Sequence, residues 1–199
     1  MTLQRFLFRF VTLTLLLFVL KSSTCQAADI QRVLILPVVN SAGVRDQAVL
    51  STIDKALTAK FRTPLSSIVP VYHIIPGDEV SAAIQEVSNR KSGSLELNTV
   101  TLRYLSNKLN ANFVIAAKVT AFRQDIVPAL SLEADQHMRI HVAVSLYYYD
   151  RDSDRYTMVR DFREYIGDEL PFSDSVYLTQ ELMDDLLAKL PLRSSRVNH

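Results

Sequence analysis

The sequence predicts one α/β domain: a mixed sheet with βαβ crossovers flanked by helices, then an antiparallel hairpin and a C-terminal helix. Two observations support this prediction. Between residues 32 and 122, three apolar or β-branched runs alternate with segments of helical periodicity, which is the order that gives crossovers, expected to be right-handed. Between residues 137 and 149, apolar and polar residues alternate, which is typical of a strand with one buried face.

The first crossover begins with an almost unbroken apolar run, "RVLILPVV", at residues 32–39. Such a run predicts a strand that is covered on both faces. The turn formers "NSAG" follow, and a helical pattern then runs from Asp46 until Pro64 ends it. The apolar stripe of this helix consists of Leu50, Ile53, Leu57 and Phe61.

The second predicted strand spans residues 68–75, where Pro70 favours an edge position or a late start of the strand, because proline cannot donate a ladder hydrogen bond. Asp78 is expected to cap the next helix, and residues 89–94 to form a solvated loop after it. The helix stripe consists of Val80, Ala83, Ile84 and Val87.

A third helix is expected after Thr99, its N-cap, with a buried stripe of Leu102, Leu105 and Leu109. Either Asn110 or Asn112 can adopt the left-handed conformation that ends this helix. The chain would then return into the apolar strand "FVIAAKVTAF" at residues 113–122. This junction therefore has a structural role: it turns a helix tightly back onto the sheet.

The last third has a different character. Residues 124–135 are interpreted as a loop or an irregular edge, and the strand after them should bury Met138, Ile140, Val142, Val144, Leu146 and Tyr148. "RDSD" turns the hairpin, and "RYTMVRDFREYI" returns with its charges in cross-strand pairs. An amphipathic helix capped by Ser173 or Asp174 follows, with Val176, Leu182, Leu186 and Leu190 inward. Residues 193–199 are expected to be a loose tail.

The first 27 residues have the pattern of a signal peptide. Arg5 and Arg9 precede an apolar stretch of about ten residues, half of what a membrane-spanning helix needs, and cleavage is expected after Ala27. The protein would then be exported, periplasmic or extracellular, without a permanent transmembrane anchor. Lipid attachment at Cys25 is an alternative, but Ser22 and Thr24 stand where attachment sequences carry an aliphatic and a small residue.

Cleavage would leave residues 28–192 as a single domain. The first 27 residues contain 3 of the 22 basic residues and none of the 21 acidic ones, so the remainder has 19 minus 21, a net charge of −2. This balance gives no electrostatic footprint for nucleic acid. Because the single cysteine, Cys25, would also be removed, the fold could contain no disulfide bond.

Two groups of side chains resemble metal sites. Glu133, Asp135, His137 and His141 are the densest set, but four residues along a strand separate the two histidines by about 13 Å, too far for one small ion. Asp150, Asp152 and Asp154 have the spacing of a calcium loop, yet Arg155 occupies the glycine position and Asp161 the glutamate position. The simpler interpretations are a polar sheet face and a hairpin turn, with weak calcium binding left open.

The remaining candidates have structural interpretations as well. No serine lies in a G-x-S-x-G motif, and four glycines give no phosphate loop. His73 is expected to be a core or edge residue, and of Tyr147–Tyr149 only Tyr148 should be buried. We therefore assign no catalytic, metal or cofactor-binding residue and expect a non-enzymatic protein.

The segments "RVLILPVVNSAG", "VYHIIPGDEVSAAIQEV" and "LRYLSNKLNANFVIAAKVTAF" resemble a family of bacterial envelope domains that includes the amino-terminal domain of TolB and the curli-secretion protein CsgG. The resemblance covers about the middle half of the chain and implies a small α/β sandwich with helices on one side of the sheet. Val38 stands where the family often has an aromatic, and no propeller repeats follow, so TolB itself is excluded.

The leading hypothesis is a non-enzymatic accessory domain of the bacterial envelope that binds another envelope protein, with hairpin 137–166 as the first place to look for the interface. The alternatives are a secreted metal-dependent hydrolase built around His137 and His141, and a lipid-anchored secretion or pore component.

Overall fold

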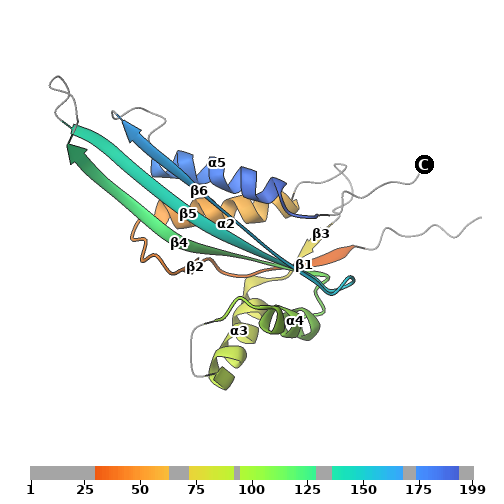
Figure 1. The fold of residues 1–199 in the computed structure, drawn as a ribbon. Coiled ribbons are helices and arrows are strands. Elements are labelled where there is room, and N and C mark those ends of the chain that lie inside the picture. The colour runs from red at the N-terminus through yellow and green to blue at the C-terminus, as the bar shows by residue number, and fades with distance from the viewer. Residues whose placement is uncertain (1–29, 63–71, 92–94, 129–135, 168–173, 193–199) are drawn as a thin grey trace, which may run out of the picture.

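The computed structural model describes residues 30–62, 72–91, 95–128, 136–167 and 174–192. It confirms the α/β class: a six-stranded mixed sheet has the order β3-β1-β4-β5-β6, with β2 paired to β4. Strands β4, β5 and β6 are long and extend well past α3 and α4 toward one end of the molecule (Figure 1). None of the helices in the described ranges is long and apolar enough to cross a membrane.

The apolar run at residues 32–39 forms two strands, β1 (Gln31–Ile35) and β2 (Val39–Asn40), where the sequence predicted one. Both pair in parallel with β4, where Ile35 lies opposite Ile115 and Val39 opposite Lys118. From Ile35 to Val39 the β1–β2 segment advances by four residues, whereas β4 advances by three from Ile115 to Lys118. The β1–β2 segment therefore contains one extra residue, which bulges out of the sheet. Pro37 lies in this bulge, where its missing N–H breaks no ladder bond.

Helices α2 (Gln47–Arg62) and α5 (Ser175–Ala188) cover one face of the sheet. Both begin at an aspartate whose carboxylate accepts a backbone N–H: Asp46 from Ala48 and Asp174 from Val176. Asp174 thus settles the two caps proposed for α5. The buried side chains of the pair are Val49, Ile53, Ala56, Leu57 and Phe61 of α2 and Leu178, Leu182, Met183, Leu186 and Leu187 of α5.

Helices α3 (Gly77–Lys91) and α4 (Thr99–Lys108) pack on the opposite face, at one end of the sheet. Two predicted caps are wrong. Asp78 lies inside the first turn of α3, and Asn98 rather than Thr99 caps α4, accepting the Thr101 N–H at 2.9 Å. The predicted loop at 89–94 is also wrong at its start, because α3 continues to Lys91.

The two crossovers place these helices on opposite faces. From β1 the chain passes through α2 to β3 (Tyr72–Ile74) at one edge, and then through α3 and α4 to β4 on the other side of β1. The first crossover moves toward one edge of the sheet and the second moves back past β1 toward the other edge. If both crossovers have the same hand, their helices must lie on opposite faces of the sheet. The resemblance implied helices on one side only; here they cover both. The edge position predicted for the second strand is confirmed.

The helix-to-strand junction is closed by two asparagines with different tasks. Asn110 has φ 49°, so it supplies the left-handed residue that ends α4. Asn112 joins the strands: its N–H donates to the Arg32 carbonyl at 2.8 Å, and its side chain accepts the Arg32 N–H at 2.9 Å. The Arg151 N–H donates to the Asn112 carbonyl at 2.9 Å. The junction therefore holds β1, β4 and the last hairpin together.

Replacing Asn110 by valine is expected to lower the free energy of unfolding by about 1–2 kcal/mol, because a branched side chain is strained at positive φ. Asn110→Gly is the matched control: it also removes the hydrogen bond that the Asn110 side chain accepts from Arg151, but it adds no strain. Urea unfolding of both variants measures the difference. An equal loss in the two variants would mean that the hydrogen bond, and not the backbone conformation, matters here.

Strands β4 (Phe113–Pro128), β5 (Gln136–Asp150) and β6 (Arg155–Gly167) form an antiparallel meander. The alternation predicted for β5 is confirmed, and β5 is a central strand. The expected loop at 124–135 is wrong for residues 124–128, which continue β4; residues 129–135 lie outside the described ranges. A register shift between Val119 and Ala121 bends β4.

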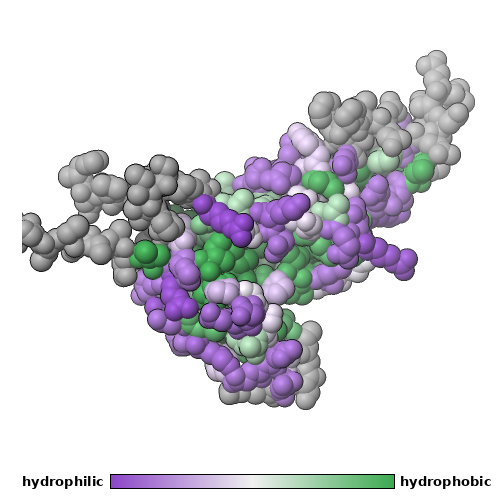
Figure 2. Space-filling model, turned by 180° about the vertical axis from the view of Figure 1, so that it is seen from behind, coloured by the Kyte–Doolittle hydropathy of each residue, from purple (hydrophilic) through white to green (hydrophobic). Residues whose placement is uncertain are grey.

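Seen from behind, apolar side chains gather next to the α3–α4 pair, between polar ones (Figure 2).

Candidate binding surface

The proposed metal ligands do not form a cluster in the described part of the chain. His137 and His141 lie on the same face of β5, as predicted, with Arg139 between them. Glu133 and Asp135 lie outside the described residues. Nowhere in the described ranges do three or more His, Cys, Asp or Glu side chains come together in a way that could hold a metal ion.

Two of the three aspartates of the supposed calcium loop, Asp150 and Asp154, have carboxylates that accept hydrogen bonds within the hairpin turn or from α4. The Asp150 carboxylate accepts the Asp152 N–H at 2.9 Å and the Ser153 hydroxyl at 2.8 Å. The Asp154 carboxylate accepts both the Arg103 guanidinium, at 2.6 and 2.9 Å, and the Tyr149 hydroxyl, at 2.6 Å. The arrangement is that of a turn joined to α4, which agrees with the simpler interpretation.

The pKa values of this turn follow from those contacts. The hydrogen bond from Tyr149 and the adjacent Arg103 guanidinium lower the pKa of Asp154 below its ordinary value. Burial and then the bond to Asp154 raise the pKa of Tyr149. Asp154 is also a non-glycine residue at positive φ, 48°. The carboxylate is therefore ionised and serves to hold the turn against Arg103 of α4.

One of the three tyrosines departs from the prediction. Tyr148 is buried as expected, but Tyr149, expected at the surface, is only 2% exposed. It points to the face that α3 and α4 cover, and it belongs to their core together with Val114 and Ala116. His73 lies exposed on the edge strand β3.

The sheet leaves part of one face without a helix on it in the described structure. Helices α3 and α4 cover this face only at one end of the sheet, and strands β4, β5 and β6 extend past them (Figure 1). We call the side chains that these strands present there, opposite to α2 and α5, the open face. The open face includes Lys118, Arg123 and Asp125 of β4, Arg139, His141 and Ala143 of β5, and Met158, Arg160, Phe162, Glu164 and Ile166 of β6.

A row of exposed apolar side chains runs along the β6 margin of the open face. Met158, Phe162 and Ile166 are 48%, 55% and 54% exposed. The His141 ring packs against the Phe162 ring with centroids 5.5 Å apart. On the same face of β6 they alternate with Arg160 and Glu164, so this margin presents large apolar side chains interleaved with charges. Exposed apolar side chains rimmed by polar residues are a mark of interaction sites.

The charges of the open face are mostly positive. Lys118, Arg123, Arg139 and Arg160 contribute four positive charges against two from Asp125 and Glu164. Arg123 and Asp125 form a two-pronged ion pair with distances of 2.8 and 2.9 Å. Outside this pair the face keeps a surplus of arginine and lysine around the apolar row. Its chemistry therefore suits a partner surface that is apolar with acidic residues at its rim.

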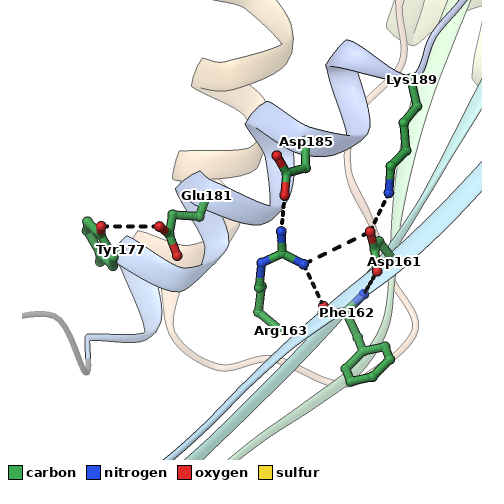
Figure 3. A network of polar contacts seen from close by, with 7 residues as sticks. All are labelled: Asp161, Phe162, Arg163, Tyr177, Glu181, Asp185 and Lys189. Carbon is green, nitrogen blue, oxygen red and sulfur yellow. Dashed lines mark hydrogen bonds and ion pairs between the residues drawn. The ribbon is translucent and has the colours of Figure 1, made fainter.

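The other side of β6 carries a polar network that reaches α5 (Figure 3). Asp161 pairs with Lys189, and Arg163 pairs with Asp185. The same two side chains bind the backbone of the residue between them: Asp161 accepts the Phe162 N–H at 2.9 Å, and Arg163 donates to the Phe162 carbonyl at 3.1 Å. The cross-strand charge pairs predicted for β6 are thus wrong here, because these charges pair with α5 instead.

We call Asp161, Arg163, Asp185 and Lys189 the edge clasp. The hydrogen bonds from Lys189 and from the Phe162 N–H lower the pKa of Asp161, so this carboxylate is ionised under ordinary conditions. The clasp occupies backbone groups in the middle of an edge strand that would otherwise be open to another strand. It is the part of the site that sequence reasoning missed. The signal was present as alternating acids and bases in "RDFRE".

The fold and the surface define a class: a small mixed α/β domain with one partly uncovered sheet face and an edge strand closed by its own side chains. No family model matches the chain, and no curated protein matches it. Several solved structures are similar in fold.

One is the hypothetical protein CT253 from Chlamydia trachomatis, with 14% identity over 79% of this chain and 94% of that chain and a TM-score of 0.48. Another is the lipoprotein GNA1162 from Neisseria meningitidis, with 14% identity, coverage of 79% and 93%, and a TM-score of 0.42. The LpoB C-terminal domain from Salmonella enterica has 8% identity, coverage of 70% and 84%, and a TM-score of 0.38. At these values the likeness supports no argument about function.

Proposed function

We propose that this chain is a non-enzymatic, exported accessory domain of the bacterial cell envelope that binds another envelope protein through the open face. The observation that carries the proposal is the row of Met158, Phe162 and Ile166, which are about half exposed although a strand could hold polar residues there. The signal-peptide pattern of residues 1–27 and the resemblance to the TolB and CsgG family support the location.

The chemistry of the open face narrows the partner. Exposed apolar side chains beside arginines favour a segment that carries apolar anchors and acidic residues, because the anchors bury the row while the acids meet Arg139 and Arg160. Arginine and aromatic residues are also the types that contribute most to binding energy at protein interfaces. The partner is therefore expected to contact β5 and β6 together.

Site-specific photo-crosslinking tests this proposal. A photoreactive side chain placed at Met158 or Phe162 is expected to give an adduct with a second envelope protein. The same group at Lys55 of α2 or Asp184 of α5, which are exposed on the opposite side, is the control and should not give that adduct. Absence of an adduct from the open face, or equal adducts from the control positions, would contradict the proposal.

A triple variant, Met158→Ser with Phe162→Ser and Ile166→Ser, should lower the yield of partner captured by the exported protein by about tenfold or more. Its thermal stability should change little, because none of the three side chains is buried. An adduct whose mass equals two copies of this chain is scored separately, since it does not support binding of a different protein.

A further inference from the structure

Strand β6 is an edge of the sheet, and its free side has an unusual feature. Within the described residues β6 pairs only with β5. The N–H and C=O of Phe162 point away from β5, because they bind the side chains of Asp161 and Arg163. In an antiparallel ladder the outward groups recur at every second residue, so those of residues 158, 160, 164 and 166 point outward as well.

The sequence of β6 is complementary to itself when it is reversed about Phe162. On the open face, Arg160 would lie opposite Glu164 of a second copy, and Met158 opposite Ile166. On the other face, Asp161 would lie opposite Arg163, and Val159 opposite Tyr165. Every charge in this arrangement meets a charge of opposite sign, and every remaining pair named here is apolar or aromatic. Pairs of both kinds stabilise antiparallel strands.

Other registers lack this match. A symmetric antiparallel pairing can be centred on an even-numbered residue, through a hydrogen-bonded pair, or on an odd-numbered one, through a non-hydrogen-bonded pair. Centring on Asp161 places two aspartates opposite each other, and centring on Arg163 places two arginines opposite each other. Centring on Arg160 places two arginines opposite each other, and centring on Glu164 places two glutamates opposite each other. Like charges directly opposite destabilise a strand pair. Phe162 is therefore the centre that the charges favour, and its outward backbone groups are compatible with it.

We propose that two copies of this chain associate through β6, antiparallel and centred on Phe162, so that their sheets join into one. The partner that fits this edge is a second copy of the chain, because the charge order of β6 matches its own reverse. A symmetric pair of this kind uses the same surface on both subunits.

In the dimer the edge clasp exchanges partners. The Phe162 N–H and C=O, held in the single chain by Asp161 and Arg163, bind the Phe162 backbone of the other copy. The released Asp161 and Arg163 then pair with Arg163 and Asp161 across the interface. In a single chain the edge clasp occupies the Phe162 backbone groups and so protects the edge from pairing with other strands. Because these side chains can swing away, the clasp does not prevent β6 from pairing with a second copy. The apolar rows of both copies stay on the same side, and the inference does not rest on the proposed function.

Charge reversal tests the register. The exported chain is expected to be a dimer in sedimentation equilibrium. Arg160→Glu alone, or Glu164→Arg alone, should weaken the dimer by about tenfold or more, because each puts like charges opposite each other twice. The double variant Arg160→Glu with Glu164→Arg should restore it. An equimolar mixture of the two single variants should also dimerise, since each chain then meets its complement.

Disulfide trapping tests the centre, in a chain whose only native cysteine is replaced by Cys25→Ser. Phe162→Cys is expected to give a covalent dimer on mild oxidation, because residues opposite each other in a hydrogen-bonded pair lie about 5.5 Å apart. Glu164→Cys is the control: its two copies would lie about 14 Å apart and should not link.

A chain that stays monomeric at all concentrations overturns the proposal, as does a double variant that fails to restore the dimer. Crosslinking at position 164 but not at position 162 overturns the register. None of these results depends on the open face binding an envelope protein, and the charge swap leaves the apolar row intact. Failure of the partner-capture experiment therefore remains distinguishable from failure of this one.

Discussion

Truncation of Phe113 to alanine is expected to lower the free energy of unfolding by about 3–5 kcal/mol. Phe113 starts β4 at the centre of the sheet, where it lies opposite Val33 of β1 and Asp150 of β5, and only 2% of it is exposed. Its ring stacks on Tyr148 with centroids 5.6 Å apart and meets Tyr72 edge-on at 6.3 Å. The loss would be a large part of the roughly 5–15 kcal/mol that stabilises a typical domain.

Urea unfolding followed by circular dichroism measures this loss. Phe113→Leu keeps most of the apolar volume and should cost about 1.5 kcal/mol or less. Val100→Ala, at a position of α4 that is 68% exposed, should be nearly neutral and serves as the surface control. Equal losses for the alanine and leucine variants would show that the ring contacts of Phe113, and not its apolar volume, account for the loss of stability.

The sequence was informative wherever burial has a simple period. On β5 the residues predicted to be inside, from Ile140 to Tyr148, are buried because one face of the strand lies under α2 and α5. The stripes of α2 and α5 are confirmed for the same reason, although Leu50 and Val176 are only partly buried: a helix packed on a sheet buries one side only. Asn110 could be foreseen as well, since asparagine tolerates the left-handed conformation.

Tyr149 could not be predicted from alternation. The two-residue period of a strand predicts that Tyr148 and Tyr149 point to opposite faces of the sheet, and they do. It does not say that α3 and α4 cover the second face at that end of the sheet and leave it open further along. Coverage by distant elements decides burial at a position where the local pattern has no information.

The extension of β4 was missed for a related reason. Residues 124–125, "QD", are polar and were taken as the start of a loop or an irregular edge, but each is paired with β5. At this end of the meander no described helix from the α3–α4 side covers the strand, so polar side chains are compatible with a ladder. The edge clasp was likewise hidden, because its partners Asp185 and Lys189 lie more than twenty residues away in sequence.

Helix α5 is expected to account for much of the stability of the β5–β6 half of the sheet. Leu182 is fully buried in the core that also contains Leu57 of α2 and Val144 of β5. Leu182→Ala should therefore lower the free energy of unfolding by about 2–5 kcal/mol, through lost burial and the cavity left behind. The size of the loss depends on how far the surrounding core can close around the gap.

Glu181→Ala is the matched control on the same turn of α5, since Glu181 is exposed and contacts only the exposed Tyr177 among the residues drawn in Figure 3. It should change stability by about 0.5 kcal/mol or less. Hydrogen exchange adds a second readout: in Leu182→Ala the amides of β6 should lose protection together with those of α5, because the edge clasp ties the two elements. Loss of protection in α5 alone would mean that the clasp does not couple helix and strand, and that β6 is held by β5 without it.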